Sequence, residues 1–386
     1  MNQFTYTSEI YLLGIFVLNF VTTFLLIPRI RNTTLKLGYI DTPDFRSSHQ
    51  NTVPTFGGIA FYISLILTLF MLQKEYDNAI IITLLVSISI LFFTGFKDDL
   101  RNSSPKAKLF GQLLAVSLLM MHSEFYISSL HGLFGIYEMP PIIGVPFSIF
   151  FLVSIINAYN LIDGIDGLAS MIGIVAAFSF AILFYNLNLY FYTGICVALI
   201  SMLFAFLRFN FSVKKKIFMG DTGSLVIGFV LGILGMRLMT LDFETVSIIG
   251  IPRNGIPFLV LTILIVPTFD VSRVIFIRII KKMSISSPDR NHIHHLLIDT
   301  GLSHKKVSLL VGFVNIFLVF MMYFSIKFVG LYTSISFLAL VLLLFIYIFF
   351  IMNRRFDAIR TRIKLRNKLS RFFRYFTSSI KKQKIK

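Results

Sequence analysis

The chain has 386 residues, of which 56% are hydrophobic and only 14% are charged, and its mean hydropathy is +0.82. Soluble globular proteins carry about 25% charged residues, so this composition excludes a soluble domain and predicts an all-α polytopic membrane protein. The net charge of +18 does not indicate a nucleic-acid partner, because basic loops that face anionic lipid explain it. A single cysteine, Cys196, excludes a disulfide framework within the chain.

Eleven apolar segments reach or approach the length of about 20 residues that a helix needs to cross a bilayer. They cover residues 10–27, 57–72, 79–96, 109–121, 142–161, 168–187, 189–207, 223–241, 256–277, 307–326 and 331–352. Residues 1–352 are therefore expected to form one transmembrane domain. The first segment lacks the basic region and the cleavage site of a signal peptide, so it is predicted to be a retained span.

An outward N-terminus places 31 of the 36 Lys and Arg residues on one side of the membrane and three on the other. The positive-inside rule assigns the basic side to the cytoplasm, so the C-terminus is predicted to be cytoplasmic. Residues 353–386 carry 13 of these basic residues, with apolar residues between them. This tail is predicted to be an amphipathic helix that lies on the anionic inner leaflet.

The first acidic cluster in chain order is Asp98-Asp99, at the inner end of the third predicted span. A carboxylate is not favoured at a helix C-terminus, where the helix dipole is negative. Two adjacent carboxylates there predict a bound cation. The alternative is a solvated pair beside Lys97 and Arg101.

Four amide and acidic side chains recur at steps of three around the end of the fifth span. They are Asn157, Asn160, Asp163 and Asp166. Gly164 and Gly167 are predicted to end the helix, which leaves the two Asn on its last turn and the two Asp in a loop. Oxygen ligands of this kind suit a hard divalent cation such as Mg²⁺, which binds carboxylates, water and substrate phosphates. The alternative, capping of helix ends, explains one or two of the four residues.

Residues 220–224, GDTGS, precede the eighth span. Small residues let a backbone approach a phosphate closely, and the N-terminus of a helix attracts anions. Asp221 is alternatively an N-terminal cap of that helix. The lysines at 214–216, just upstream, are expected to hold phosphates or lipid headgroups, with lipid headgroups favoured.

Pro267 is predicted to kink the ninth span. Asp270 and Arg273 lie three residues apart in the same span and are predicted to pair with each other. This pair is expected to have a structural role at the inner end of the helix.

The longest inner loop contains the sequence DRNHIHH. Its basic side chains are Arg290, His292, His294 and His295. Zinc is a weak interpretation of three histidines within four residues, because the motif lacks the i, i+4 pair of common helical zinc sites and a cysteine partner. Arg and His donors that face a diphosphate are the favoured interpretation.

All of these clusters fall on the predicted cytoplasmic side, and together they resemble the motifs of one enzyme family. The motifs are, in order, HQNTVPTFGG, GFKDDL, NAYNLIDGIDGLA, FMGDTGSLVIGF, VPTFDVSRV and DRNHIHH. The sequence resembles the polyprenyl-phosphate N-acetylhexosamine-1-phosphate transferases of glycosyltransferase family 4, a superfamily that includes the lipid-I-forming translocase of peptidoglycan synthesis. The order His-Ile-His-His resembles the GlcNAc-1-phosphate branch. The loop FNFSVKKKIFMGD departs from the family pattern, with no proline and one extra residue, which leaves the choice of sugar open.

The resemblance implies transfer of an N-acetylhexosamine 1-phosphate, with GlcNAc favoured, from a UDP-sugar to undecaprenyl phosphate. The products are undecaprenyl-diphosphate-HexNAc and UMP, and the reaction is the first membrane step of a cell-surface glycan. Direct displacement and a covalent phospho-Asp intermediate both fit, with direct displacement favoured. The implied location is the bacterial inner membrane, in contact with its lipids, with the active site facing the cytoplasm and with a homodimer as the assembly.

The same resemblance implies Mg²⁺ as the cofactor, with Mn²⁺ as the alternative, and roles for individual residues. The implied catalytic residues are Asp98, Asp99, Asp163 and Asp166. The implied metal ligands are Asp221, Asn160 and Asp99. The implied substrate-binding residues are His49, Thr55, Asn157, Asn210, Lys216, Arg290, His292, His294 and His295.

Two other functions stay open at the level of the sequence. A secondary transporter places ionisable groups near the middle of the bilayer, on broken helices of repeated halves. Here the carboxylates lie at the inner rim and no repeat is visible. An inactive scaffold of the same fold is disfavoured because the acidic residues of every motif are present.

Overall fold

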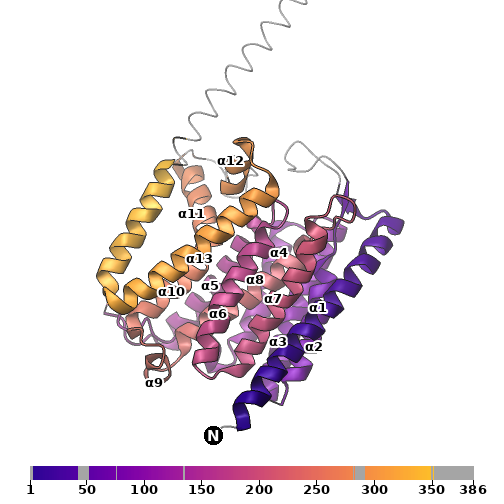
Figure 1. Cartoon of the computed structure of the whole chain (residues 1–386). Coiled ribbons are helices and arrows are strands. Elements are labelled where there is room, and N and C mark those ends of the chain that lie inside the picture. The colour runs from indigo at the N-terminus through magenta and orange to yellow at the C-terminus, as the bar shows by residue number, and fades with distance from the viewer. Residues whose placement is uncertain are drawn as a thin grey trace, which may run out of the picture.

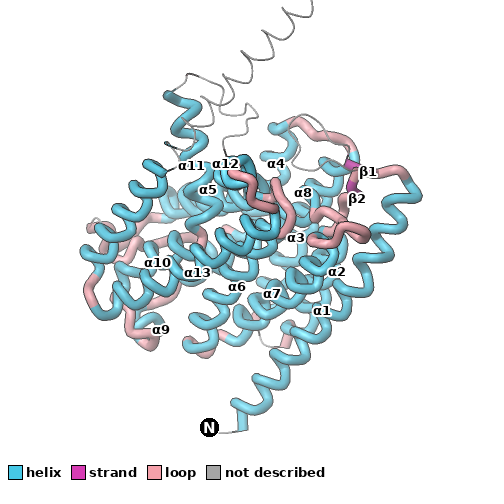
Figure 2. The backbone as a smooth tube through the Cα atoms, turned by 45° about the horizontal axis from the view of Figure 1, so that its top comes forward, coloured by secondary structure: helices cyan, strands magenta, loops and turns pink. Residues whose placement is uncertain are grey.

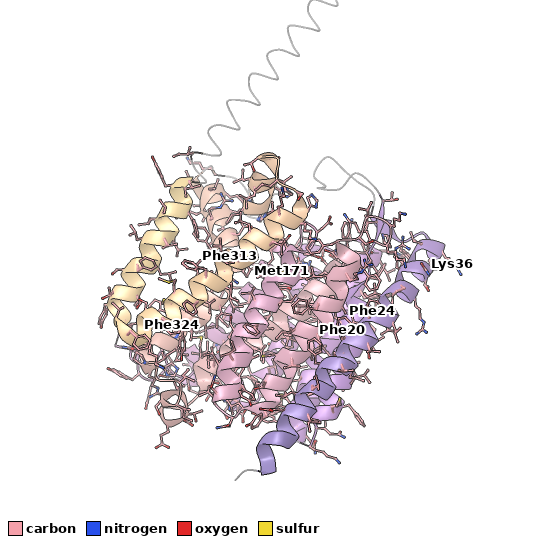
Figure 3. The ribbon with its side chains drawn as sticks, viewed as in Figure 1. Phe20, Phe24, Lys36, Met171, Phe313 and Phe324 are labelled. Carbon is pink, nitrogen blue, oxygen red and sulfur yellow. The ribbon has the colours of Figure 1, made fainter. Side chains whose placement is uncertain are left out.

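The computed structural model describes residues 3–41, 52–74, 76–133, 135–280, 282, 292–348 and 351, and it is largely helical. The long helices lie side by side and connect two ends of the molecule (Figure 1), and their side chains fill the space between them (Figure 3). A helix satisfies its own backbone hydrogen bonds, which a bilayer requires. The predicted all-α class is therefore confirmed, whereas the predicted tail at residues 353–386 lies outside the described residues.

The helices and strands follow one another in a simple order. The helices are α1 (Gln3–Leu37), α2 (Gly58–Leu72), α3 (Asn78–Leu100), α4 (Pro105–Leu119), α5 (Pro141–Ile162), α6 (Leu168–Asn186), α7 (Tyr190–Asn210), α8 (Gly220–Thr240), α9 (Phe243–Ser247), α10 (Ile256–Ile263), α11 (Ile265–Ile280), α12 (Ile293–Asp299), α13 (His304–Phe328) and a final helix at Leu331–Ile348, with 3-10 turns at Ser123–Phe125 and Arg253–Gly255. Two short strands, β1 (Ile40–Asp41) and β2 (Val53–Pro54), pair antiparallel before α2. Figure 2 shows these strands at the end of the molecule where α4 and α12 also lie.

The number of membrane spans depends on how the shorter helices are counted. Among the described residues, eight helices are long and apolar enough to cross a membrane, or nine if α10 and α11 form one broken span. A count of eleven also requires α2 and α4, which have 15 residues each. Such a helix is about 22 Å long, less than the hydrocarbon core of about 30 Å. The count of eleven and the orientation of the N-terminus stay predictions.

Helix α8 forms the centre of the bundle and packs on α2, α3 and α5. Its most apolar window is 94% buried, against 11% in the final helix. Glycines let the neighbouring helices approach it closely: a Cβ atom at Gly58 would overlap the backbone of Gly223, and one at Gly95 would overlap the backbone of Asp221. The N-terminus of α8 is thereby fixed against α2 and α3. In α7, which packs on α1, α2 and α6, Cys196 is fully buried.

A bend of 75° separates α10 from α11, which confirms the predicted kink. Pro267 has no N–H group for the carbonyl of Ile263, and its ring clashes with that carbonyl. Helix α10 therefore ends at Ile263. Asn315 of α13 donates a hydrogen bond to the carbonyl that is left over, at 3.4 Å.

Candidate active site at the ends of α3, α5 and α8

The turn between α5 and α6 places two carboxylates at one end of the bundle. Helix α5 ends at Ile162, Asp163 takes its C-terminal cap position, and Gly167 has a φ of +77°. A Cβ atom at Gly167 would also overlap the ring of Phe211, so glycine is required there. The predicted end of the helix is confirmed, because the two Asn lie within α5 and the two Asp follow it.

Two of the predicted substrate-binding amides have partners within the protein. Buried Asn210 accepts a hydrogen bond from the N–H of Gly167 at 2.5 Å and donates one to the carbonyl of Ile217 at 2.9 Å. Asn157 exchanges two hydrogen bonds with Gln112 of α4, at 2.8 and 3.1 Å. Both amides therefore hold neighbouring segments of the site together. Their direct contact with a substrate stays a prediction.

Asp99 caps the N-terminus of α8. Its carboxylate accepts hydrogen bonds from the backbone N–H groups of Asp221 and Thr222, both at 2.9 Å, and from the Thr222 hydroxyl. Unpaired N–H groups and the helix dipole stabilise a carboxylate at this position. Two expectations are corrected as a result. Asp221 lies in the first turn of α8 rather than at its cap, and Asp99 occupies the N–H groups that were expected to face a substrate phosphate.

Lys108 of α4 lies among the remaining acidic and amide side chains. Its ammonium group contacts Asp221, lies 3.1 Å from Asn160 Oδ1 and lies 3.7 Å from Asp98 Oδ2. Asn160 Nδ2 also donates to Asp221 Oδ1 at 2.8 Å and to Ser224 Oγ at 2.7 Å. The structure therefore brings together residues from three motifs that are far apart in the sequence. We refer to Asp98, Asp99, Asn160 and Asp221 as the acidic cluster.

Asp163 and Asp166 lie close to this cluster in different charge environments. Burial and the negative charges of neighbouring carboxylates raise the pKa of Asp163 well above its ordinary value. Burial acts in the same direction on Asp166, but close contacts with His304 and Lys216 outweigh it and hold the pKa of Asp166 below its ordinary value. Lys216 Nζ is 2.6 Å and His304 Nδ1 is 3.1 Å from Asp166 Oδ2. A bound cation would relieve the repulsion at Asp163.

The segment before α2 reaches the start of α8. Backbone hydrogen bonds of 2.9 to 3.0 Å join residues 54–58 to residues 218–219. These bonds place half-buried Thr55 beside the loop that leads into the acidic cluster. The sequence predicted that the first inner loop contributes to the site, and at Thr55 the structure is consistent with that prediction.

Helix α12 carries the histidine motif and is tied to α11 by Asp270. The carboxylate of Asp270 lies 3.0 Å from His292 Nδ1 and accepts a hydrogen bond from the N–H of Ile293 at 2.9 Å. Asp270 also pairs with Arg273 at 3.5 Å, as predicted. Asp270 therefore also holds the start of α12, where His292 and His295 are both buried. The predicted ligands His49, Arg290 and the side chain of His294 lie outside the described residues.

Two residues of the site were missed by sequence reasoning. Lys108 lies eight residues after the end of the second motif, GFKDDL, and looks like any basic residue of an inner loop. His304 opens α13, beyond the last motif. The one available signal was the excess of acidic over basic side chains in the motifs, which requires cations from elsewhere in the chain or from a ligand.

The donor chemistry of the acidic cluster suits a hard divalent cation. In the described part of the chain, no three His, Cys, Asp or Glu side chains are grouped as metal ligands. Mg²⁺, however, is commonly held by one or two carboxylates together with the phosphates of a substrate. The oxygens of Asp98, Asn160 and Asp221 already converge on one ammonium group, so these residues fit such an ion.

A helical membrane bundle with carboxylates, amides and basic side chains gathered at one end is the arrangement of a membrane enzyme that handles anionic substrates. Residues 80–239, which include the acidic cluster and Lys108, match the model of glycosyl transferase family 4. The chain is 30% identical over 303 residues to the probable undecaprenyl-phosphate N-acetylglucosaminyl 1-phosphate transferase of Bacillus subtilis (strain 168). The aligned region covers 78% of this chain and 81% of that protein. The chain belongs to this family of phosphoglycosyltransferases.

Similar proteins from other bacteria carry related names. The undecaprenyl-phosphate alpha-N-acetylglucosaminyl 1-phosphate transferase of Escherichia coli (strain K12) is 32% identical over 323 residues, or 81% of each chain. The protein of the same name from Yersinia pestis is 29% identical over 318 residues, or 81% of this chain and 82% of its own. The matched region thus extends well beyond the acidic cluster on both sides.

Proposed function

We propose that this protein transfers an N-acetylhexosamine 1-phosphate, with GlcNAc as the favoured sugar, from a UDP-sugar to undecaprenyl phosphate. The products are undecaprenyl-diphosphate-HexNAc and UMP, and the reaction opens the membrane phase of a cell-surface glycan. The names of the relatives support this reaction. The observation that carries it is the convergence of Asp98, Asn160 and Asp221 on Lys108, because a transfer between two anionic substrates needs carboxylates and cations in one place.

In this reaction an oxygen of the lipid phosphate forms a bond to the β-phosphorus of the UDP-sugar. The bond from that phosphorus to the bridging oxygen breaks, and UMP leaves with the bridging oxygen. Lys108 binds the phosphates and offsets their charge, and Asp98 orients the lipid phosphate or takes its proton. Catalysis rests on positioning and charge neutralisation, since both reactants are anionic. Mg²⁺, or Mn²⁺ in its place, held by Asp221 and Asn160, would supply further positive charge to the diphosphate.

The remaining acidic residues act in support. Asp99 holds the first turn of α8, and with it Asp221, in place. Asp163 and Asp166 organise the cation and the nucleotide beside the cluster, and the histidines of α12 contact the diphosphate. We favour direct displacement over a covalent phospho-Asp, because Asp98, Asp99 and Asp221 all have hydrogen-bond or ion-pair partners within the protein.

We further propose that the acidic cluster faces the cytoplasm of a bacterium from its inner membrane, in a chain with eleven spans. The uneven distribution of Lys and Arg supports this orientation, since the described parts of the basic segments that follow α3 and precede α8 share one end of the bundle. A homodimer is the assembly that we expect.

The test is an assay of UMP release by purified protein with undecaprenyl phosphate, Mg²⁺ and a panel of UDP-N-acetylhexosamines. We expect release that requires the lipid, stops with EDTA and is fastest with UDP-GlcNAc. Release with a different sugar would keep the reaction and change the substrate. No release with any sugar, from protein that is folded by circular dichroism, would contradict the proposal and favour an inactive scaffold.

A further inference from the structure

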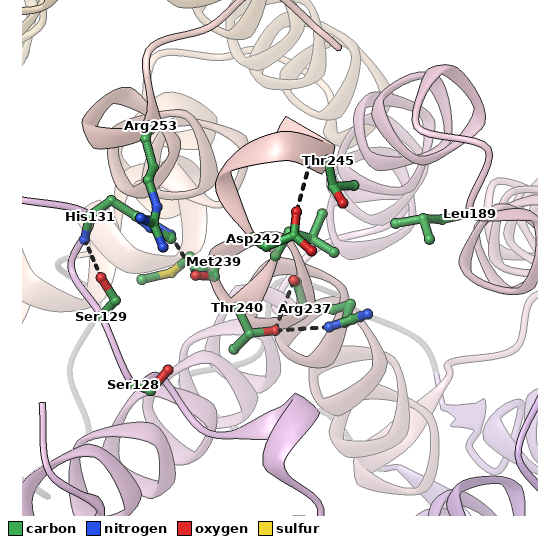
Figure 4. A pocket seen from close by; sticks show the side chains of 11 residues that line it. Ser128, Ser129, His131, Leu189, Arg237, Met239, Thr240, Asp242, Thr245 and Arg253 are labelled. Carbon is green, nitrogen blue, oxygen red and sulfur yellow. Dashed lines mark hydrogen bonds between the residues drawn. The ribbon is translucent and has the colours of Figure 1, made fainter. Parts of the chain in front are cut away.

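A polar cavity lies at the C-terminal end of α8 (Figure 4), whereas the acidic cluster lies at the N-terminal end of the same helix. The cavity has a volume of about 300 Å³, and its lining includes Ser128, His131, Arg237, Asp242 and Arg253. The rise along α8 from Asp221 to Arg237 is about 24 Å at about 1.5 Å per residue. The cavity is therefore separate from the site of the proposed reaction, which uses none of its residues.

Arg253 is held in the cavity by a histidine whose protonation state follows from its partners. Arg253 Nε donates to His131 Nδ1 at 2.7 Å, and His131 Nε2 lies 2.6 Å from the carbonyl oxygen of Met239. A guanidinium can only donate and a carbonyl can only accept, so His131 is neutral with its proton on Nε2. Burial, together with the charge of Arg253, lowers the pKa of His131, which agrees with this assignment. The terminal nitrogens of Arg253 have no hydrogen-bond partner among the residues that the structure describes.

Arg237 is the second guanidinium of the cavity, and its contacts with acceptors are long. It lies over the ring of Tyr192, 5.4 Å from the ring centroid, 3.4 Å from the Thr240 hydroxyl and 3.7 Å from the Glu124 carboxylate. Its Nε atom is buried and has no partner within the described ranges. Buried donors without partners are rare in folded proteins, which indicates an acceptor from outside the chain.

The two carboxylates near the cavity, Glu124 and Asp242, each have other hydrogen-bond donors. Glu124 accepts a hydrogen bond from the hydroxyl of Tyr76 and lies 3.3 Å from the hydroxyl of Tyr192. Asp242 accepts a hydrogen bond from the N–H of Thr245 at 2.7 Å, as the cap of α9. The guanidinium donors of the cavity therefore exceed the acceptors that the surrounding carboxylates offer.

The loop that lines the cavity carries side chains typical of a membrane interface. Tyr137 of this loop is 69% exposed, and Ile142, in the first turn of the following helix α5, is 82% exposed. The ring of Tyr137 also packs over Gly132, next to His131. Tyrosines are enriched at the level of lipid headgroups, so an exposed tyrosine beside the cavity favours a lipid headgroup as its ligand.

We propose that this cavity is a second anion site, which binds the phosphate group of an anionic lipid headgroup through Arg237 and Arg253. Paired guanidiniums match the geometry of phosphate oxygens. Inorganic phosphate has the same chemistry and is the other source of such a group. The outward position of the cavity rests on the proposed function and its orientation, whereas the binding of phosphate does not.

The test measures binding without any UDP-sugar, so that its outcome is independent of transferase activity. Protein in phosphatidylcholine nanodiscs is titrated with dioleoyl phosphatidic acid, and bound lipid is counted by native mass spectrometry. We expect Arg253→Gln to weaken binding about tenfold, as expected for the loss of charge-assisted hydrogen bonds. Lys74→Gln, which removes an exposed charge on the same predicted side of the membrane, serves as the matched control and should leave binding unchanged.

A second variant guards against a folding defect. Asp242→Asn keeps a side-chain acceptor for the N–H of Thr245 but removes a negative charge from the cavity, so it should tighten the binding of phosphatidic acid several-fold. A misfolded protein cannot give this result. A parallel arm adds inorganic phosphate and follows the thermal unfolding midpoint. If phosphate alone raises the midpoint, and Arg253→Gln abolishes the rise, the site takes its anion from solution; binding that is equal in all variants in both arms overturns the proposal.

Discussion

The two ends of α8 carry opposite imbalances of charge. At one end, Asp98, Asn160 and Asp221 share the ammonium group of Lys108, and burial together with neighbouring carboxylates raises the pKa of Asp163. At the other end, the guanidiniums of Arg237 and Arg253 have more donors than the surrounding carboxylates accept. One helix therefore joins a site that needs cations to a site that needs an anion. The local shortage of partners, rather than the net charge of the chain, indicates the ligand at each end.

The largest effect on this comparison is expected from Asp221→Asn. The change keeps the shape of the side chain but removes a negative charge from the acidic cluster. Because the cluster is proposed to act on developing charge, the rate of UMP release should fall by about 100-fold or more, and its dependence on Mg²⁺ should weaken. The rate is measured over a Mg²⁺ titration, with thermal unfolding as a control for folding. A variant with the full rate and an unchanged Mg²⁺ curve would show that Asp221 is not part of the site.

Lys108→Gln tests whether the acidic end of α8 depends on the ammonium group that Asp98, Asn160 and Asp221 share. The acidic cluster then loses its internal positive charge, and UMP release should fall by about 10- to 100-fold, with a higher Mg²⁺ concentration at half-maximal rate if the ion and the ammonium act together. Lys106→Gln changes an exposed lysine of the same helix and is the matched control. Equal activity of the two variants would assign Lys108 a structural role only.

Gly58→Ala tests how much the close contact between α2 and α8, at the acidic end of the bundle, contributes to stability. The added methyl group would overlap the backbone of Gly223, and overpacking of this kind costs about 1–3 kcal/mol in folding free energy. The thermal unfolding midpoint in detergent should therefore fall. Gly14→Ala is the control, because nothing lies within 4 Å of the Cβ position there. Equal midpoints for the two variants would mean that the contact between α2 and α8 can relax without cost.

The smallest expected effect is a pH dependence at the cavity. Folding lowers the pKa of His131, so the folded state favours the neutral imidazole. This preference stabilises the fold fully above the pKa of an unfolded histidine, about 6.5, and the stabilisation is lost as the pH falls below that pKa. Glutamine can replace both hydrogen bonds without titrating. Between pH 7.5 and pH 5, the unfolding midpoint of the natural protein should thus fall relative to His131→Gln. A difference that does not vary with pH would contradict the neutral histidine.

Much of the fold follows from local sequence signals. Apolar length located the helices, and the glycines after α5 marked the turn that carries Asp163 and Asp166. The kink at Pro267 follows from its missing N–H group. Segments of 15 residues were harder, because hydropathy alone does not decide whether helices such as α2 and α4 cross the bilayer.

The details of the site depend on pairings between distant residues, which no local pattern encodes. Asp99 was expected to bind a metal, which stays a prediction, and the sequence did not show that its two oxygens cap α8 from another helix. Asp270 was expected only to pair with Arg273, yet it also holds the start of α12. Nothing in the sequence distinguishes Lys108 from the other lysines of the inner loops. The cavity at the opposite end has no motif, because its two arginines come from α8 and from the loop before α10.

The burial of Cys196 has a practical consequence for experiments. Since the chain has no other cysteine and this thiol is inaccessible, membrane-impermeant maleimides should label only cysteines that are introduced. A cysteine at exposed Lys74 should react in intact cells, and one at exposed Lys106 should react only after the membrane is opened. The protein without an introduced cysteine serves as the unlabelled control. Two single substitutions are then enough to determine which end of the bundle faces the cytoplasm.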